Sequence, residues 1–434
     1  MEHTKNKKLL DISFESEMDF HDEKDEKKSS GSKGKSSGKG LLWQFIAIAS
    51  IPLVMVLGNS MLVPILPDLE RELGVSQFQS SLVITLFSVT AGLFIPIAGY
   101  LSDRFSRKAV IIPSLIVYGA AGILAGFGAV WNSYTILIIA RAVQGLGAAG
   151  TAPIAMALVG DLYKGGTESK ALGLTEASNG TGKVLSPIIG SLFAMIVWYA
   201  PFFAFPVFCV LSLLAVIFII KEPKKEKPMT GLKKYLHTIG DIFQKNGKWL
   251  VPSFFAGSLA LFILFGVLFY LSDILEKDPY NIDGVLKGAI LAIPLLGLVV
   301  TSYTTGSIIK KNGILMRKLM NIGLVIMSVS LALTIFFLDR IYIFIGLLTL
   351  SSVGTGLLVP CLNTMITGSV SKGERGMITS LYSSLRFLGV AAGPPLFGWM
   401  MEKSHKLIFI SVSILSAVTL ALVFFLIKPD KKVS

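Results

Sequence analysis

The sequence is poor in charged residues and in the side chains that build covalent or metal crosslinks. Only 15% of its 434 residues are charged and 53% are hydrophobic, whereas soluble proteins carry about 25% charged residues. The two cysteines, Cys209 and Cys361, lie within long apolar runs, which excludes a disulfide framework and a C-x-x-C metal site. Histidine does not occur in the interior of such a run, which excludes histidine metal sites and proton relays there. These scarcities exclude a soluble enzyme and indicate an integral membrane protein.

The start of the chain differs from this apolar pattern. Residues 1–40 carry equal numbers of lysines and acids and end in a run of Ser, Gly and Lys. Such a composition cannot bury enough apolar surface to fold, so we expect a disordered tail. The first apolar run begins only near Leu41, so no cleavable signal peptide is expected.

Beyond the tail, twelve apolar runs are long enough to cross a bilayer, which takes about 20 residues of helix. Lipid offers no partner for unpaired backbone groups, so we expect each run to be a helix and the protein to be all-α. The runs cover residues 43–66, 80–102, 109–130, 133–159, 171–197, 200–220, 249–272, 285–309, 315–337, 341–366, 376–400 and 405–427.

The charged residues between the runs predict the topology. Residues 103–108, 221–248 and 310–318 are basic, the last two with net charges of +5 and +4. Residues 68–72 and 273–287, on the opposite side, each sum to −2. Cationic loops stay in the cytoplasm, so we expect both termini there, in a multi-pass protein of the cell membrane. The net charge of +13 therefore indicates topology and attraction to anionic lipids, and no nucleic-acid partner is expected.

The chain also shows an internal repeat. An offset of 207 residues superimposes glycines and prolines of the second, fourth and fifth runs on their counterparts in the other half: Gly99 on Gly306, Gly147 on Gly354, Pro153 on Pro360, Gly182 on Gly389 and Pro187 on Pro394. Such repeats are typical of transporters. We therefore expect a cytoplasmic tail (1–40), a six-helix bundle (41–220), a basic cytoplasmic linker (221–248), a second six-helix bundle (249–428) and a cytoplasmic tail (429–434).

Three motifs occur at fixed places in these runs. The stretch GYLSDRFSRK at 99–108 resembles the signature loop of the major facilitator superfamily. The stretch LIIARAVQGLGAA at 137–149 is similar to the family's fourth-helix motif, and GKVLSPIIG at 182–190 resembles its antiporter motif. The partner stretch GVAAGPPLFG at 389–398 follows the same glycine–proline pattern. The resemblance covers about residues 41–428.

The resemblance implies two six-helix bundles around a central cavity that opens alternately to each side of the membrane. The antiporter pattern implies the subgroup of multidrug and metabolite exporters, which use the proton gradient as their energy source. No enzymatic activity, cofactor or metal is expected, and the partners are a small-molecule substrate, protons and membrane lipids. We expect a monomer.

The signature loop predicts a conformational latch beside Gly99. Asp103 lies at a helix-to-loop corner. There it could meet the positive N-terminus of the eleventh apolar run (span eleven, 376–400), near Gly376. Arg104 or Arg107 could pair with Asp161 at the end of span four. Alternatively, these residues only fix topology and cap a turn.

The glycines and prolines of spans five and eleven have two possible roles. Pro187 and Pro394 bend their helices at matched depth, and bent helices suit alternating access. Small residues equally permit close helix packing. The residues expected to serve either role are Gly182, Pro187, Gly190, Gly389, Gly393 and Pro394.

Polar residues at membrane depth are the candidates for proton coupling and for the substrate cavity. Glu176, Asn179 and Lys183 follow helical spacing on one face of span five. A charge at this depth costs at least about 2.5–3.5 kcal/mol, so such groups usually face water and function; ion pairs that join helices are the alternative. The other candidates are Arg141, Gln144, Arg386 and Asn59.

Glu176 is the leading coupling residue, because it is the one carboxylate well inside an apolar run. Its protonation could be linked to Lys183, on the same face. Arg141, Lys183 and Arg386 outnumber Glu176, which leaves the membrane interior at +2. This balance disfavours organic cations and favours anionic, zwitterionic or neutral amphiphilic substrates.

The motifs leave three alternatives to a proton-coupled exporter. The chain could import an anionic nutrient, flip a lipid-linked sugar, or act as a membrane sensor that transports nothing. The signature loop argues against a sensor. The substrate, the proton stoichiometry and the role of the tail do not follow from the sequence.

Overall fold

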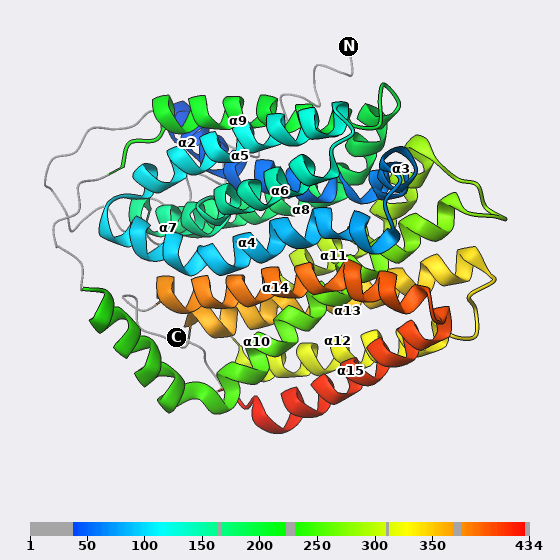
Figure 1. The fold of residues 1–434 in the computed structure, drawn as a ribbon. Coiled ribbons are helices and arrows are strands. Elements are labelled where there is room, and N and C mark those ends of the chain that lie inside the picture. Colours follow the sequence, from blue (N-terminus) through cyan, green and yellow to red (C-terminus); the bar gives the residue numbers. More distant parts are fainter. Residues whose placement is uncertain (1–37, 164–165, 223–230, 310–311, 369–374, 430–434) are drawn as a thin grey trace, which may run out of the picture. The chain divides into compact units, whose positions relative to one another are not determined.

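The computed structural model describes residues 38–163, 166–222, 231–309, 312–368 and 375–429, so the expected tails lie almost wholly outside it. Residues 44–434 form one compact unit. Its regular elements are helices (Figure 1): α2 (Gly38–Ser60), η2 (Val63–Ile65), α3 (Leu66–Leu73), α4 (Gln77–Arg104), α5 (Arg107–Val130), α6 (Tyr134–Ala149), α7 (Ala152–Leu162), α8 (Gly166–Ala194), α9 (Ala200–Ile219), α10 (Leu232–Glu276), α11 (Gly284–Ile309), α12 (Gly313–Thr334), α13 (Ile341–Gly368), α14 (Arg375–Met401) and α15 (His405–Leu426).

Ten helical stretches of the described residues are long and apolar enough to cross a membrane. The expected spans five and eleven correspond to α8, with 29 residues, and α14, with 27. Both are long enough to cross but more polar, since they carry residues such as Lys183 and Arg386. They pack on other helices of the protein, α8 on α11 and α14 on α4 and α10, which accommodates polar side chains. The all-α membrane fold is confirmed.

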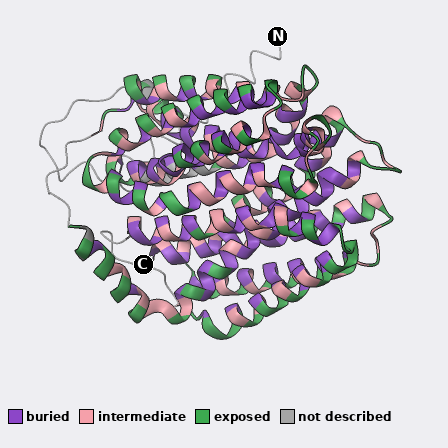
Figure 2. Cartoon of the chain, in the orientation of Figure 1, coloured by how far each residue is buried: buried purple, intermediate pink, exposed green. Residues whose placement is uncertain are grey.

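Large apolar side chains are exposed along the outer helices. Phe218 of α9 is 75% exposed, and Phe425 of α15 is 67% exposed. Figure 2 shows exposed residues recurring along α9 and α15, at the top and bottom of the view. Water-facing surfaces rarely carry apolar patches of this extent, so these faces are suited to lipid.

The two halves of the compact unit meet along two helix pairs, α4 with α14 and α8 with α11. Figure 1 shows α4 and α14 side by side at the centre of the view. Helix α4 runs from one end of the bundle, which holds Asp68, to the other, which holds Asp103. We call these the Asp68 end and the Asp103 end.

Two helices differ from the expected spans. The run at 133–159 is two helices, α6 and α7, because the chain turns at Gly150 and Thr151. Helix α10 begins at Leu232, so it takes in much of the expected linker as well as span seven. Its first turns pack one apolar side against the bundle, with Tyr235 buried beside Tyr100. Residues 223–230 of that linker lie outside the described residues.

Candidate functional site

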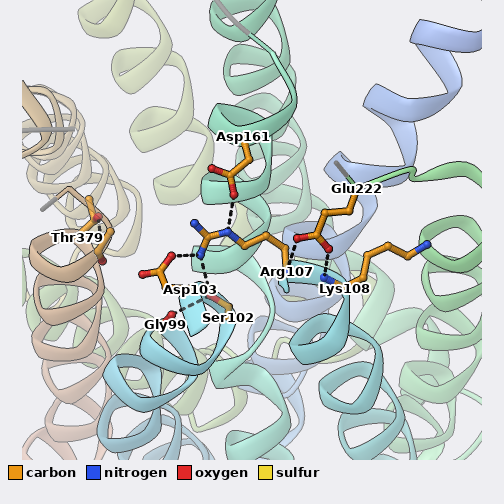
Figure 3. A network of polar contacts seen from close by, with 9 residues as sticks. Gly99, Ser102, Asp103, Arg107, Lys108, Asp161, Glu222 and Thr379 are labelled. Atoms are coloured by element: carbon orange, nitrogen blue, oxygen red, sulfur yellow. Dashed lines mark hydrogen bonds and ion pairs between the residues drawn. The ribbon is translucent and has the colours of Figure 1, made fainter. Parts of the chain in front are cut away.

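The latch residues converge on Arg107, at the start of α5 (Figure 3). Its Nη1 lies 2.5 Å from Asp103 Oδ1, and its Nε lies 2.8 Å from Asp161 Oδ2. Nη1 also donates to Ser102 Oγ at 2.8 Å. The guanidinium is largely buried and connects the ends of α4, α5 and α7. Arg104 instead is exposed and donates to Tyr100 Oη at 3.3 Å, so Arg107 is the arginine that pairs with Asp161.

The same corner faces the other half of the protein. A Cβ on Gly376, in the first turn of α14, would lie 3.5 Å from Asp103 Oδ2. A Cβ on Gly99 would lie only 2.6 Å from Ser380 Oγ, so glycine permits α4 to approach α14 closely. The carboxylate therefore lies at the helix N-terminus where partial positive charge favours it.

A third carboxylate, which was not predicted from the sequence, supports this corner. Glu222 accepts hydrogen bonds from the backbone N–H of Arg107 at 2.7 Å and of Lys108 at 2.9 Å. Lys108 Nζ in turn donates to the carbonyl oxygens of Ile217 at 3.1 Å and Ile220 at 2.8 Å. The first turn of α5 and the last turn of α9 thus cap one another. The available signal was an acid two residues after the apolar run 200–220, at the same end of the bundle as the basic start of α5.

The motif glycines lie at close helix contacts. A Cβ on Gly190 would overlap the carbonyl oxygen of Met61, and one on Gly389 would overlap that of Ser258. A Cβ on Gly393 would also overlap a carbonyl oxygen, that of Phe262, whereas one on Gly182 would make a tight contact of 3.0 Å with the Leu53 side chain. Pro187 and Pro394 lie inside α8 and α14. Close packing is therefore one role of these residues, and their role in movement stays a prediction.

Arg141 of α6 is fully buried inside the first half. It donates to the carbonyl oxygens of Val83 at 2.9 Å and Gly58 at 3.4 Å. Two of the other candidates also accept from it: Asn59 Oδ1 at 3.2 Å and Gln144 Oε1. Its guanidinium lies 4.5 Å from the centroid of the Phe87 ring. These contacts join α2, α4 and α6, and they leave Arg141 with no exposed surface in this conformation.

The polar residues of α8 and α14 are more open. Arg386 is half-buried, and its Nη1 lies 3.5 Å from Asn363 Oδ1. Asn179 and Lys183 are half-buried in the middle of α8. The side chain of Glu176 lies outside the described residues, while its backbone belongs to α8. The structure therefore brings Asn59 and Gln144 into contact with Arg141, while Arg386 contacts Asn363.

An ion-pair network at the Asp68 end joins the two halves. Arg71 Nη1 of α3 lies 3.1 Å from Glu276 Oε1 of α10. Lys287 Nζ of α11 lies 2.6 Å from Glu276 Oε2, and Arg71 also pairs with Asp68. Ser272 Oγ adds a hydrogen bond across the halves, to the carbonyl oxygen of Val63 at 3.0 Å. From the sequence alone, these residues were predicted only as charges of the loops between spans.

Comparisons with known proteins agree with this architecture. The model of the Major Facilitator Superfamily matches residues 48–316 and 274–434. The chain is 42% identical over 390 residues to the bacillibactin exporter of Bacillus subtilis, which covers 89% of this chain and 96% of that protein. It is 27% identical over 356 residues to the multidrug efflux protein YfmO of the same organism, covering 82% and 86%.

A solved structure shows the same fold. The human organic anion transporter MFSD10 (TETRAN) superimposes with a TM-score of 0.69 at 18% identity, covering 88% of this chain and 99% of that one. From its matched family model, its relatives and its fold, this chain belongs to the major facilitator superfamily of membrane transporters.

Proposed function

We propose that the protein is a proton-coupled exporter of a metabolite or drug-like molecule in the cell membrane. The observation that carries this proposal is its 42% identity to the bacillibactin exporter over nearly the full length of both chains. Bacillibactin is therefore the first substrate to test. The further relatives named for multidrug efflux and tetracycline resistance also support export rather than import.

The charge distribution orients the proposed transporter. The basic segment 103–108 and the start of α12, with Arg317 and Lys318, belong to the Asp103 end. We assign this end to the cytoplasm, together with both termini. The acidic segments 68–72 and 273–287 belong to the opposite end, which then faces outward. This orientation makes the latch cytoplasmic and the Arg71–Glu276 pair external.

Alternating access would require the contacts at the two ends to break in turn. Arg71 and Glu276 hold the halves together at the external end. Asp103, beside Gly376, holds α4 against α14 at the cytoplasmic end. Export of substrate from the cytoplasm would begin with the cytoplasmic contacts broken and finish with the external ones broken. A ligand shifts such an equilibrium only by its unequal affinity for the two states.

Glu176 is the proposed proton carrier, because it lies within α8 at membrane depth. Its protonation would neutralise a charge that is costly in a closed protein interior. Protonated Glu176 would then favour one conformation and the bound substrate the other, which couples the two fluxes. Lys183, two turns further along α8, is the proposed electrostatic partner or substrate anchor.

Purified protein in liposomes tests this proposal. Vesicles with an imposed pH gradient should accumulate bacillibactin above its external concentration, and a protonophore should abolish that accumulation. Protein-free vesicles serve as the control. Equal movement with and without the gradient would refute proton coupling. Failure to move bacillibactin or any of a panel of efflux substrates would refute export and favour the sensor.

A further inference from the structure

Two arginines lie at membrane depth in opposite halves, and their surroundings differ. Arg141 has four acceptors from the protein and no exposed surface. Arg386, in the middle of α14, has one long hydrogen bond, 3.5 Å from Nη1 to Asn363 Oδ1. Its Nε is buried and has no partner among the described residues. Arg141 thus uses four of its five N–H donors within the protein, whereas Arg386 uses one among the described residues.

Among the residues that the structure describes, the charge of Arg386 also has no counter-ion, since no carboxylate there forms an ion pair with its guanidinium. The guanidinium lies 5.4 Å from the centroid of the Tyr382 ring, one turn earlier on α14, which favours a cation but does not neutralise it. A charge at membrane depth without an ion-pair partner is costly, and such charges usually face water and serve function.

The side-chain amide of Asn363 is a second hydrogen-bond donor beside the Arg386 guanidinium. Asn363 of α13 uses its Oδ1 to accept from Arg386, while its Nδ2 makes no hydrogen bond among the described residues. Both side chains are half-buried rather than sealed. An acceptor placed against both would satisfy free N–H groups from two helices at once.

The internal repeat places a polar residue at the equivalent position of the other half. With the offset of 207 residues, Arg386 corresponds to Asn179 of α8. The Oδ1 of Asn179 is buried and has no partner in the described part of the chain. The two halves thus both present an unsatisfied polar side chain at the same depth of matching helices, one of them cationic.

We propose that Arg386 and Asn363 form the subsite that binds an anionic group of the transported molecule, such as a carboxylate. The planar guanidinium matches a carboxylate in two parallel hydrogen bonds. The Tyr382 ring holds the guanidinium in place, and Asn363 both orients it and donates to the anion. This proposal rests on the proposed function in that the bound anion belongs to a transported substrate.

Arginine modification tests the subsite directly, without a transport assay. Phenylglyoxal, which reacts with accessible arginines, is added to the wild-type protein in lipid nanodiscs, and modified peptides are measured by mass spectrometry. Arg386 should react and Arg141 should not, because only Arg386 has free surface. The anion 1-naphthoate should protect Arg386, while its uncharged isostere 1-naphthamide should not. An unreactive Arg386, or equal protection by the two compounds, would overturn the proposal.

Variants give an independent readout of affinity. Arg386→Gln should weaken 1-naphthoate binding about tenfold, a change of 1.4 kcal/mol, and leave 1-naphthamide binding within about twofold. Arg386→Lys keeps the charge but loses the planar fork, so its affinity should lie between the two. Arg317→Gln is the matched control, since Arg317 contacts the Phe424 carbonyl oxygen at 2.7 Å and lies near the start of α12. Equal losses in Arg386→Gln and Arg317→Gln would count against the subsite.

The two proposals fail separately. If the anion protects Arg386 but vesicles move neither bacillibactin nor any compound of the efflux panel, the anion-binding site stands and the proposed export is wrong. If vesicles export bacillibactin but neither compound affects Arg386, the export stands and the subsite is wrong.

Discussion

Arg71 and Glu276, 205 residues apart in the chain, form an ion pair of 3.1 Å between the two halves. Glu276 also holds Lys287, whose side chain is only 3% exposed, whereas that of Arg71 is 62% exposed. One carboxylate thus serves an exposed partner across the halves and a buried partner within its own half. Exposed pairs contribute about 0–1 kcal/mol, while removing one partner of a buried pair is far more destabilising, about 3–5 kcal/mol.

The first prediction separates these two roles of Glu276. Arg71→Gln should shift the equilibrium toward opening at the Asp68 end by about fivefold at most, which is what 1 kcal/mol allows, and leave the melting temperature unchanged. Glu276→Gln should shift the same equilibrium and also lower the melting temperature, because it leaves the buried ammonium group of Lys287 without its ion-pair partner. Alkylation of a cysteine at position 63 reports opening, and thermal unfolding in detergent reports stability. Identical melting temperatures in the two variants would contradict the assignment.

The second prediction concerns the latch. Asp103→Asn should reduce transport and favour opening at the Asp103 end, because the carboxylate beside Gly376 is lost while the chain still folds and inserts. Asp161→Asn is the matched control, since Asp161 pairs with the same Arg107 but belongs to α7. If Asp103 acts as the latch, Asp103→Asn should shift the conformational equilibrium more than Asp161→Asn does. Unchanged transport kinetics in that variant would remove Asp103 from the mechanism.

The third prediction concerns Glu222, the carboxylate that caps α5. Glu222→Ala should lower stability by about 1 kcal/mol, the usual contribution of a helix cap, because the N–H groups of Arg107 and Lys108 lose their acceptor. Glu222→Gln keeps acceptor oxygen but loses charge, so it should lose less. Thermal unfolding of the three proteins, measured in the same detergent, gives the comparison. A larger loss in the Gln variant than in the Ala variant would contradict capping.

The sequence predicts the helices and the candidate residues, but it does not predict which of these residues contact one another. The helices follow from the lengths of the apolar runs and the signature loop from the spacing of its residues, so both could be predicted from local sequence. Contacts between distant residues, such as Arg71 with Glu276, depend on how the halves pack and leave no local pattern. Arg141 and Arg386 look alike in sequence, since each is a lone cation in an apolar run. Only the contacts in the structure distinguish them: Arg141 makes four hydrogen bonds within the protein, and Arg386 makes one among the described residues.

The fourth prediction is the topology of the proposed transporter. A single cysteine replacing Lys233, an exposed residue at the start of α10, should react with a membrane-impermeant maleimide only after the cells are broken. The two native cysteines are buried and should stay unlabelled. A cysteine replacing Asp278, in the turn after α10 at the Asp68 end, should react in intact cells. Labelling of position 233 in intact cells would refute the orientation.

The last prediction is that Glu176 carries the proton and that Lys183 acts with it. Glu176→Gln permanently mimics the protonated form, so it should abolish transport driven by a pH gradient while binding stays largely intact and independent of pH. Lys183→Ala should weaken the binding of anionic substrates more than that of neutral ones, because it removes a positive charge at membrane depth. Glu402→Gln, which changes an exposed carboxylate just beyond α14, should behave as the wild type in both assays. The assignment fails if vesicles with Glu176→Gln still concentrate substrate in response to an imposed proton gradient, since a side chain that cannot be charged cannot couple the two fluxes.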